Sequence, residues 1–188
     1  GVGVWLTPAI NIHRTPLCGR NFEYYSEDPL VAGEMAAAMV EGIQSEGVGA
    51  SLKHFACNNK ETNRKDSDSR LSERALREIY LKGFEICVKK AQPLTVMSSY
   101  NLLNGLWASQ NRELLTDILR GEWGFKGMVT TDWYTHAPQY TEIAAGNDVK
   151  MGCGDAAHTL KMMQEGKLKR EDVVISVRRL LEMILKLA

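Results

Sequence analysis

Short apolar runs alternate with longer amphipathic stretches along the whole chain. Five of these runs have the length of buried β-strands, and they cover residues 4–7, 49–53, 94–98, 128–132 and 148–151. The stretches between them repeat apolar positions every three to four residues, as helices do. Because strands that alternate with helices pair in parallel and are covered by those helices, the pattern predicts an α/β fold.

The first two amphipathic stretches carry the start and stop residues of helices. One follows a cap and a proline at residues 26–29 and should end just before Gly47. Ser72 can cap the other, which must end before Pro93 because a residue that precedes proline avoids the helical conformation. The inward face of this second helix should consist of Leu76, Ile79, Tyr80, Phe84, Cys87 and Val88.

Three further helices are expected. Asn111 can cap one of them, and another covers about residues 155–164. The helix after Asn111 should point Leu114, Leu115, Ile118 and Leu119 inward. The last helix carries a one-sided apolar stripe that we expect to face the core, and it consists of Val173, Val174, Val177, Leu180, Leu181, Ile184 and Leu185.

Two architectures fit this alternation, an open doubly wound sheet and a (β/α)8 barrel. No GxGxxG follows a strand and no GxxxxGK[ST] occurs, which weighs against the nucleotide-binding sheets. A barrel carries its chemistry where strands end, and polar residues gather there in this chain: Asn11, His13, Lys53, His54, Ser98, Tyr100, Asn101, Asp132 and Trp133. We therefore expect one domain over residues 1–188, an incomplete (β/α)8 barrel with about five units and the first units missing.

Composition excludes several classes of protein. Lys and Arg number 23 and Asp and Glu also 23, so no basic surface for nucleic acid is indicated. No apolar run approaches the roughly 20 residues of a membrane helix. The four cysteines form no CxxC pair, so neither a metal site nor a disulfide framework is expected. The chain starts without a signal peptide, which favours a cytoplasmic location, although any targeting sequence would lie upstream of Gly1.

Asp132 is the strongest candidate for a catalytic residue. It ends an apolar run, so its carboxylate should project from a strand end, where it can be a nucleophile, a general base or a metal ligand. The structural alternative is a cap for the following helix. The adjacent Trp133 favours a sugar site, because aromatic faces stack on the apolar faces of pyranose rings.

Lys53 and His54 form a second candidate cluster. Lys53 can form a Schiff base if burial lowers its pKa, or it can stay charged and donate to substrate hydroxyls. A nearby carboxylate such as Asp132 would favour the charged form, and a purely structural ion pair is the third possibility. Arg20 and Arg64 lie in polar loops, where a solvated surface charge is the usual role for an arginine.

Seven segments carry motifs that occur together in one protein family. In order and spacing they resemble family 3 glycoside hydrolases of the β-glucosidase type, and the resemblance spans nearly the whole chain. In that family a catalytic barrel precedes a second, α/β sandwich domain. The segments are residues 8–14, 18–29, 53–64, 72–80, 97–101, 115–125 and 131–133.

The resemblance implies an enzyme that hydrolyses terminal, non-reducing β-D-glucosyl residues with retention of configuration. Asp132 would be the nucleophile, and no metal or organic cofactor would be needed. Tyr100 would lie close to the nucleophile, and Met97 and Trp133 would line the pocket. The side chains that would bind sugar hydroxyls are Arg20, Lys53, His54 and Arg64.

Two departures from the family pattern leave alternatives open. The acid/base Glu would come from the second domain of the parent chain, which these residues do not include, so the segment is expected to hold half of the catalytic machinery. Thr131 and Tyr134 stand where Ser and Gly are common. The alternatives are a β-xylosidase or α-arabinofuranosidase of the same family, a Schiff-base lyase that uses Lys53, and an inactive sugar-binding fragment.

Overall fold

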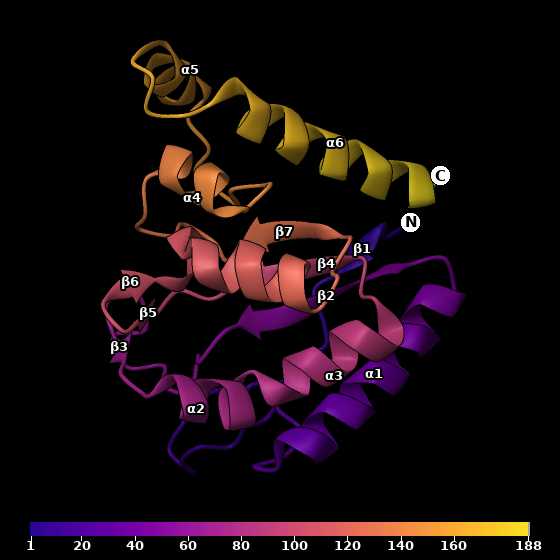
Figure 1. The fold of residues 1–188 in the computed structure, drawn as a ribbon. Coiled ribbons are helices and arrows are strands. Elements are labelled where there is room, and N and C mark those ends of the chain that lie inside the picture. The colour runs from indigo at the N-terminus through magenta and orange to yellow at the C-terminus, as the bar shows by residue number, and fades with distance from the viewer. Residues whose placement is uncertain (188) are drawn as a thin grey trace.

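A curved parallel sheet organises the molecule. The computed structural model describes residues 1–187, in which four strands pair in the order β1-β2-β4-β7. All three pairings are parallel, and Figure 1 shows α1 and α3 below the sheet and α4, α5 and α6 above it. The strands are β1 (Val4–Trp5), β2 (Gly49–Phe55), β4 (Thr95–Ser98) and β7 (Met128–Thr131).

Helices connect the strands of this sheet, as the alternation predicts. The helices are α1 (Pro29–Ser45), α2 (Glu73–Ala75), η1 (Leu76–Tyr80), α3 (Lys82–Ala91), η2 (Ala108–Gln110), η3 (Glu113–Glu122), α4 (Gln139–Ala145), α5 (Ala156–Gln164) and α6 (Arg170–Leu187). Three of the expected caps are present, because the side chains of Asp28, Ser72 and Asn111 accept from backbone amides of the first helical turn. No helix among residues 1–187 is long and apolar enough to cross a bilayer.

The fifth expected strand is much shorter than predicted. Among the described residues, the segment after α4 joins the sheet through a single parallel bridge between Val149 and Thr130. The first strand is also short, but its pairing resumes beyond Pro8, where Ala9 bridges Lys53. The α/β fold with a parallel sheet is confirmed, and its strands are fewer than the eight that close a barrel.

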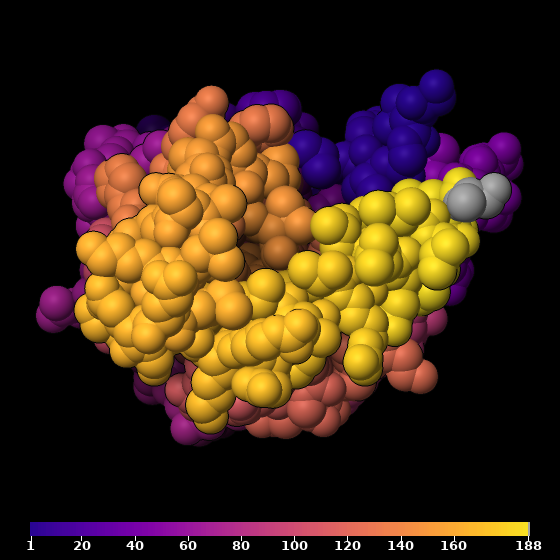
Figure 2. Space-filling view, turned by 90° about the horizontal axis from the view of Figure 1, so that it is seen from above, coloured from indigo at the N-terminus to yellow at the C-terminus, as the bar shows by residue number. Residues whose placement is uncertain are grey.

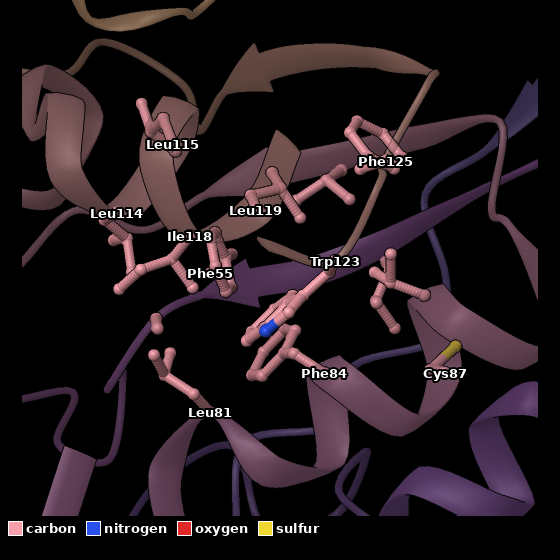
Figure 3. Close-up of a cluster of buried hydrophobic side chains, with 14 of the residues drawn as sticks. Phe55, Leu81, Phe84, Cys87, Leu114, Leu115, Ile118, Leu119, Trp123 and Phe125 are labelled. Carbon is pink, nitrogen blue, oxygen red and sulfur yellow. The ribbon is translucent and has the colours of Figure 1, made fainter. Parts of the chain in front are cut away.

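Aromatic side chains join the sheet to the helices beneath it. Phe55 of β2 packs against Phe84 of α3 and Trp123, with ring centroids 5.1 and 5.8 Å away. Figure 3 shows these rings together, with leucines of η3 above them. Helices α1 and α3 approach closely because both carry glycine at their crossing: a Cβ on Gly33 would lie 2.9 Å from the carbonyl oxygen of Gly83.

The helix that Ser72 caps differs from the expected regular α-helix. Its η1 segment makes a wider turn in which the Leu81 amide donates to the Leu76 carbonyl, five residues back, at 2.8 Å. This turn contains one residue more than a regular α-helical turn, which rotates the rest of the helix. Leu81 is therefore buried and Ile79 is exposed. The prediction that Ile79 faces the core was therefore wrong, while the inward positions of Phe84, Cys87 and Val88 are confirmed.

The apolar stripe of α6 was predicted to face the core, and this was wrong. Val177 is 49% exposed and Ile184 48%, and only Val173 and Leu180 of the stripe are partly buried. Figure 2 shows α6 in yellow along the surface, with N-terminal residues in indigo beside its C-terminal end. A Cβ on Gly3 would lie 3.6 Å from Leu187 Cδ1, which agrees with this placement.

Two helices and one small sheet were not predicted. The helices are the short η2, which follows β6, and α4, which follows β7. The small sheet contains β3 (Asp68–Ser69), β5 (Leu102–Leu103) and β6 (Leu106–Trp107), and β5 and β6 form a hairpin around Asn104 and Gly105. Both turn residues have positive φ, and Asn-Gly is the sequence most typical of such a turn.

Candidate active site

Asp132 stands directly after β7, where the parallel pairing with β4 fixes its backbone. Its amide donates to the Ser98 carbonyl at 3.1 Å, and its carboxylate oxygen Oδ1 accepts from the Trp133 amide at 2.7 Å. The residue is only 6% exposed. The other oxygen, Oδ2, faces a buried histidine.

That histidine is His54, and its Nε2 lies 3.8 Å from Asp132 Oδ2. The same nitrogen accepts from Arg20 Nη1 at 2.9 Å, which requires the neutral ring with its proton on Nδ1. Burial first, and then the charges of Arg20, Lys53 and Arg64, hold the pKa of His54 well below its usual value. His54 is therefore a neutral hydrogen-bonding group beside the carboxylate.

Lys53 is paired with a carboxylate other than the expected one. Its Nζ lies 3.3 Å from Glu23 Oε2. The pairing of β2 with β4 shifts register between Leu52 and Phe55, and such a bulge allows the consecutive Lys53 and His54 to serve the same site. An ammonium held by Glu23 is not the free amine that a Schiff base needs, so this geometry weakens the lyase alternative.

Glu23 and Glu61 are the site residues that were not predicted. Glu23 binds Arg20 as well as Lys53, and Glu61 lies 3.4 Å from Arg20 Nε and 2.9 Å from Arg64 Nη1. Each carboxylate therefore joins two cations into one network. The spacing offered a signal, because Glu23 follows Arg20 by three residues and Glu61 precedes Arg64 by three.

The network brings together most of the predicted site residues. Its three cations, Arg20, Lys53 and Arg64, are balanced by the carboxylates of Glu23, Glu61 and Asp132. Such balance keeps the cations ordered without the cost of an unpaired buried charge. Arg20 and Arg64 therefore lie within the candidate site and are not isolated surface charges.

The small sheet explains why the Arg64 loop is ordered. The indole nitrogen of Trp107 donates to the Lys65 carbonyl at 3.1 Å, and the Leu102 amide donates to the Ser67 carbonyl at 2.9 Å. The guanidinium carbon of Arg64 lies 4.6 Å above the Tyr100 ring, a cation–π distance. The hairpin of β5 and β6 therefore fixes the loop that carries Arg64.

Met97 and Trp133 differ in their exposure to solvent. Met97 lies within β4 and is buried, whereas Trp133 is 47% exposed and its ring lies 6.3 Å from that of Tyr134. Trp133 is the most exposed of the predicted site residues, which suits contact with a bound molecule. No group of three or more metal-ligating side chains occurs among residues 1–187.

Opposing effects set the ionisation of Asp132. Burial raises the pKa of its carboxyl group above the usual value. Hydrogen bonds from the Trp133 amide and the Tyr100 hydroxyl, and the charges of Arg20 and Arg64, lower this pKa and offset part of the effect of burial. Tyr100 is thus a neutral donor whose hydroxyl stabilises the carboxylate form.

We expect Tyr100→Phe to raise the pKa of Asp132 further, because one donor to the carboxylate is lost. If ionised Asp132 is required for activity, the acidic limb of the kcat/KM profile should move to higher pH by about 0.5–1 unit, the equivalent of one hydrogen bond. The pH dependence of kcat/KM measures this shift. Tyr140→Phe, on the distant helix α4, is the control, and an unchanged acidic limb in Tyr100→Phe would contradict the assignment.

Comparison with known proteins identifies the family of this chain. The model of the family described as "Glycosyl hydrolase family 3 N terminal domain" matches residues 1–183. Beta-glucosidase A of Butyrivibrio fibrisolvens is 60% identical over 171 residues, which are 91% of this chain and 21% of that protein. The exo-alpha-(1->6)-L-arabinopyranosidase of Bifidobacterium longum is 56% identical over 150 residues, 80% of this chain and 20% of that protein.

Solved structures give the same result for the fold. Beta-glucosidase 3B from Thermotoga neapolitana, in complex with glucose, superposes with a TM-score of 0.96 at 52% identity, over 99% of this chain and 27% of that one. The chain spans about a fifth to a quarter of the length of these relatives. The predicted resemblance is confirmed: the chain belongs to glycoside hydrolase family 3, and its fold is that of the family's N-terminal domain.

Proposed function

We propose that this chain carries the nucleophile and the sugar-binding side chains of a retaining, exo-acting β-glucosidase. The observation that supports the proposal most strongly is the buried Asp132 carboxylate within the network of Arg20, His54 and Arg64. A carboxylate among cationic and neutral donors is suited to stabilise the oxocarbenium-like transition state of glycoside cleavage. The substrate class is terminal, non-reducing β-D-glucosides.

In the proposed first step, a carboxylate oxygen of Asp132 forms a bond to the anomeric carbon while the bond to the leaving oxygen breaks. That oxygen takes a proton from a carboxylic acid, which we assign to a Glu of a second α/β sandwich domain in the parent chain. Water then attacks the glycosyl ester, gives its proton to the same Glu and releases Asp132. Two inversions give net retention, and no metal or organic cofactor takes part.

The cationic network supplies the sugar contacts in this proposal. Arg20, Lys53 and Arg64 donate to ring hydroxyls, and these charge-assisted bonds strengthen as charge develops on the sugar. His54 is a neutral contact, because its ring carries a single proton. The remaining walls of the sugar pocket are Met97, Tyr100 and Trp133.

The choice of sugar rests on the relatives. Several of them are named β-glucosidases, and structural neighbours hold glucose, which supports glucose as the preferred sugar. The arabinopyranosidase relative supports α-L-arabinopyranose as a second candidate, and β-xylose and α-arabinofuranose stay open as alternatives. A panel of nitrophenyl glycosides of these four sugars, assayed with the full-length protein, separates them by kcat/KM.

A mechanism-based trap tests the nucleophile. We expect an activated 2-deoxy-2-fluoro-β-D-glucoside to inactivate the full-length protein and to add one fluoroglucosyl group to the peptide that contains Asp132. Fluorine slows both the formation and the hydrolysis of the ester, whereas a good leaving group speeds only its formation, so the ester accumulates. Peptide mass spectrometry measures the site. Label on another residue, or turnover with inversion, would contradict the proposal.

Three other tests address the remaining alternatives and the location of the protein. Borohydride reduction with a carbonyl substrate would capture Lys53 only in a Schiff-base lyase. Assay of residues 1–188 alone tests the fragment alternative, in which sugar binds weakly and turnover is absent. Fractionation of the source cells tests the cytoplasmic location, which stays a prediction.

A further inference from the structure

A buried lysine supports the loop that follows Asp132. This loop connects β7 with α4 and also carries the half-exposed Trp133. From the opposite segment, Lys150 Nζ donates to the Thr135 carbonyl at 3.1 Å, to the Thr135 hydroxyl at 3.0 Å and to the Ala137 carbonyl at 2.8 Å. One ammonium group therefore fixes two carbonyls of the loop.

Glu142 completes this arrangement from α4. Its Oε2 lies 2.8 Å from Lys150 Nζ, and its Oε1 accepts from the Thr135 hydroxyl at 2.6 Å. The side chain of Lys150 is 7% exposed and that of Glu142 is 1% exposed. The three side chains form a closed, buried ring in which the ammonium, the hydroxyl and both carboxylate oxygens have partners.

The backbone beside Lys150 holds the loop at two more points. The Tyr134 amide donates to the Met151 carbonyl at 3.1 Å, and the Met151 amide donates to the Thr131 hydroxyl at 3.0 Å. These bonds lie on either side of Asp132 in the sequence. The segment around Lys150 therefore anchors the loop before and after the candidate nucleophile.

Stability alone is a weak reason for a buried ion pair. Removing two charges from water is costly, and a well-packed apolar pair of similar volume is often equally stable or more so. An apolar pair cannot, however, hold the carbonyls of Thr135 and Ala137 in fixed positions. The geometry thus points to a positioning role.

We propose that Lys150 and Glu142 are positioning residues that set where Trp133 stands beside Asp132, and so how tightly the substrate is held against the nucleophile. This inference rests on the proposed glycosidase function. Because a displacement of about 1 Å can lower a rate by about 100-fold, the effect should be large although neither residue touches the substrate.

Three variants of the full-length protein test the role. Lys150→Met should lower kcat/KM for a nitrophenyl glucoside by about 10–100-fold and speed amide hydrogen exchange over residues 133–137. Lys150→Met with Glu142→Leu should bring Tm back near that of the wild type but leave kcat/KM low. Lys90→Met removes another Lys–Glu pair, the exposed pair with Glu34 between α3 and α1, and should leave activity unchanged.

The double variant separates positioning from simple structural support. Recovery of both Tm and kcat/KM in that variant would overturn the proposal, as would unchanged kcat/KM in Lys150→Met. If Lys150→Met does not fold, the double variant alone decides. If the wild type cleaves none of the glycosides, the proposed function fails. The inference is then tested by hydrogen exchange alone, and an exchange rate over residues 133–137 that is the same in the double variant as in the wild type would overturn it.

Discussion

Asp132→Asn in the full-length protein should lower kcat for β-glucoside hydrolysis by at least about 10⁴-fold, the scale of loss when a nucleophile is removed. The amide keeps an acceptor for the Trp133 amide, so the loop should keep its conformation. What is lost is the charged oxygen that attacks the anomeric carbon in the proposed mechanism. Steady-state kinetics on a nitrophenyl glucoside measure the effect.

Chemical rescue makes this prediction specific to the nucleophile. In Asp132→Gly, azide can occupy the space of the carboxylate and attack the anomeric carbon once, so the product from an activated β-glucoside should be the α-glucosyl azide. Asp117→Asn, on the exposed face of η3, is the matched control and should retain full activity. Residual activity above about 1% in a pure Asp132→Asn preparation would refute the assignment.

The same substitution should not destabilise the protein at neutral pH. Burial raises the pKa of Asp132 above its value in the unfolded chain. Between the two pKa values the folded state binds the proton and the unfolded state does not, so stability falls as pH rises through this window and the cost persists above it. Asn avoids that cost, so the variant should gain stability relative to the wild type at pH 7. The gain should shrink below about pH 4, where the carboxyl is protonated in both states.

Asp148→Asn should give the largest loss of stability, about 3–5 kcal/mol. The Asp148 side chain is fully buried and joins three elements: it binds Arg120 of η3 at 2.8 Å, Arg179 of α6 at 3.0 Å and the Val129 amide of β7 at 2.8 Å. Burial raises the pKa of Asp148 as it does that of Asp132, but the cations beside Asp132 keep glutamate partners when it is replaced, since Arg20 pairs with Glu23 and Arg64 with Glu61. Replacing Asp148 instead leaves the buried Arg120 uncompensated. The expected fall in Tm is roughly 6–20 °C, measured by calorimetry.

An exposed aspartate provides the comparison for this effect. Asp66 contacts His136 at 3.1 Å, but both side chains are about half exposed. Asp66→Asn should therefore change stability by less than about 1 kcal/mol. A similar small change in Asp148→Asn would show that the buried carboxylate contributes nothing net to the fold.

The periodic pattern predicted the parts of the fold that depend on local rules. The ends of β4 and β7 were identified to within one residue, because in an α/β chain a short apolar run followed by polar residues seldom occurs except at the end of a buried strand. The ends of β1 and β2 were each misplaced by two residues. The pattern placed Asp132 at the carboxyl edge of the sheet, whereas Lys53 and His54 were expected where β2 ends and lie among its last three residues. The caps at Ser72 and Asn111 were equally local features, and the structure contains both.

The failures arose where the outcome depends on tertiary packing. A glutamate in a charged loop, such as Glu61, is typical of a solvated surface until the chain brings Arg20 and Arg64 to it. The sequence of α6 has the same apolar stripe whether or not another element packs against it, so the pattern alone could not predict that the stripe is exposed. The Asn104-Gly105 turn was a local signal that was overlooked, and it would have indicated the hairpin that orders the Arg64 loop.

The division of the candidate site between a strand and two loops has a consequence for how the enzyme can diversify. Asp132 is fixed by the paired strands, whereas Arg20 and Arg64 are carried on loops that have their own internal bonds. If the proposed roles hold, insertions or replacements in these loops can retarget the protein to a different sugar while the proposed nucleophile stays in place. Because the bond-breaking residue and the sugar-binding residues would lie on separate elements, the same fold could acquire new substrates by small evolutionary steps.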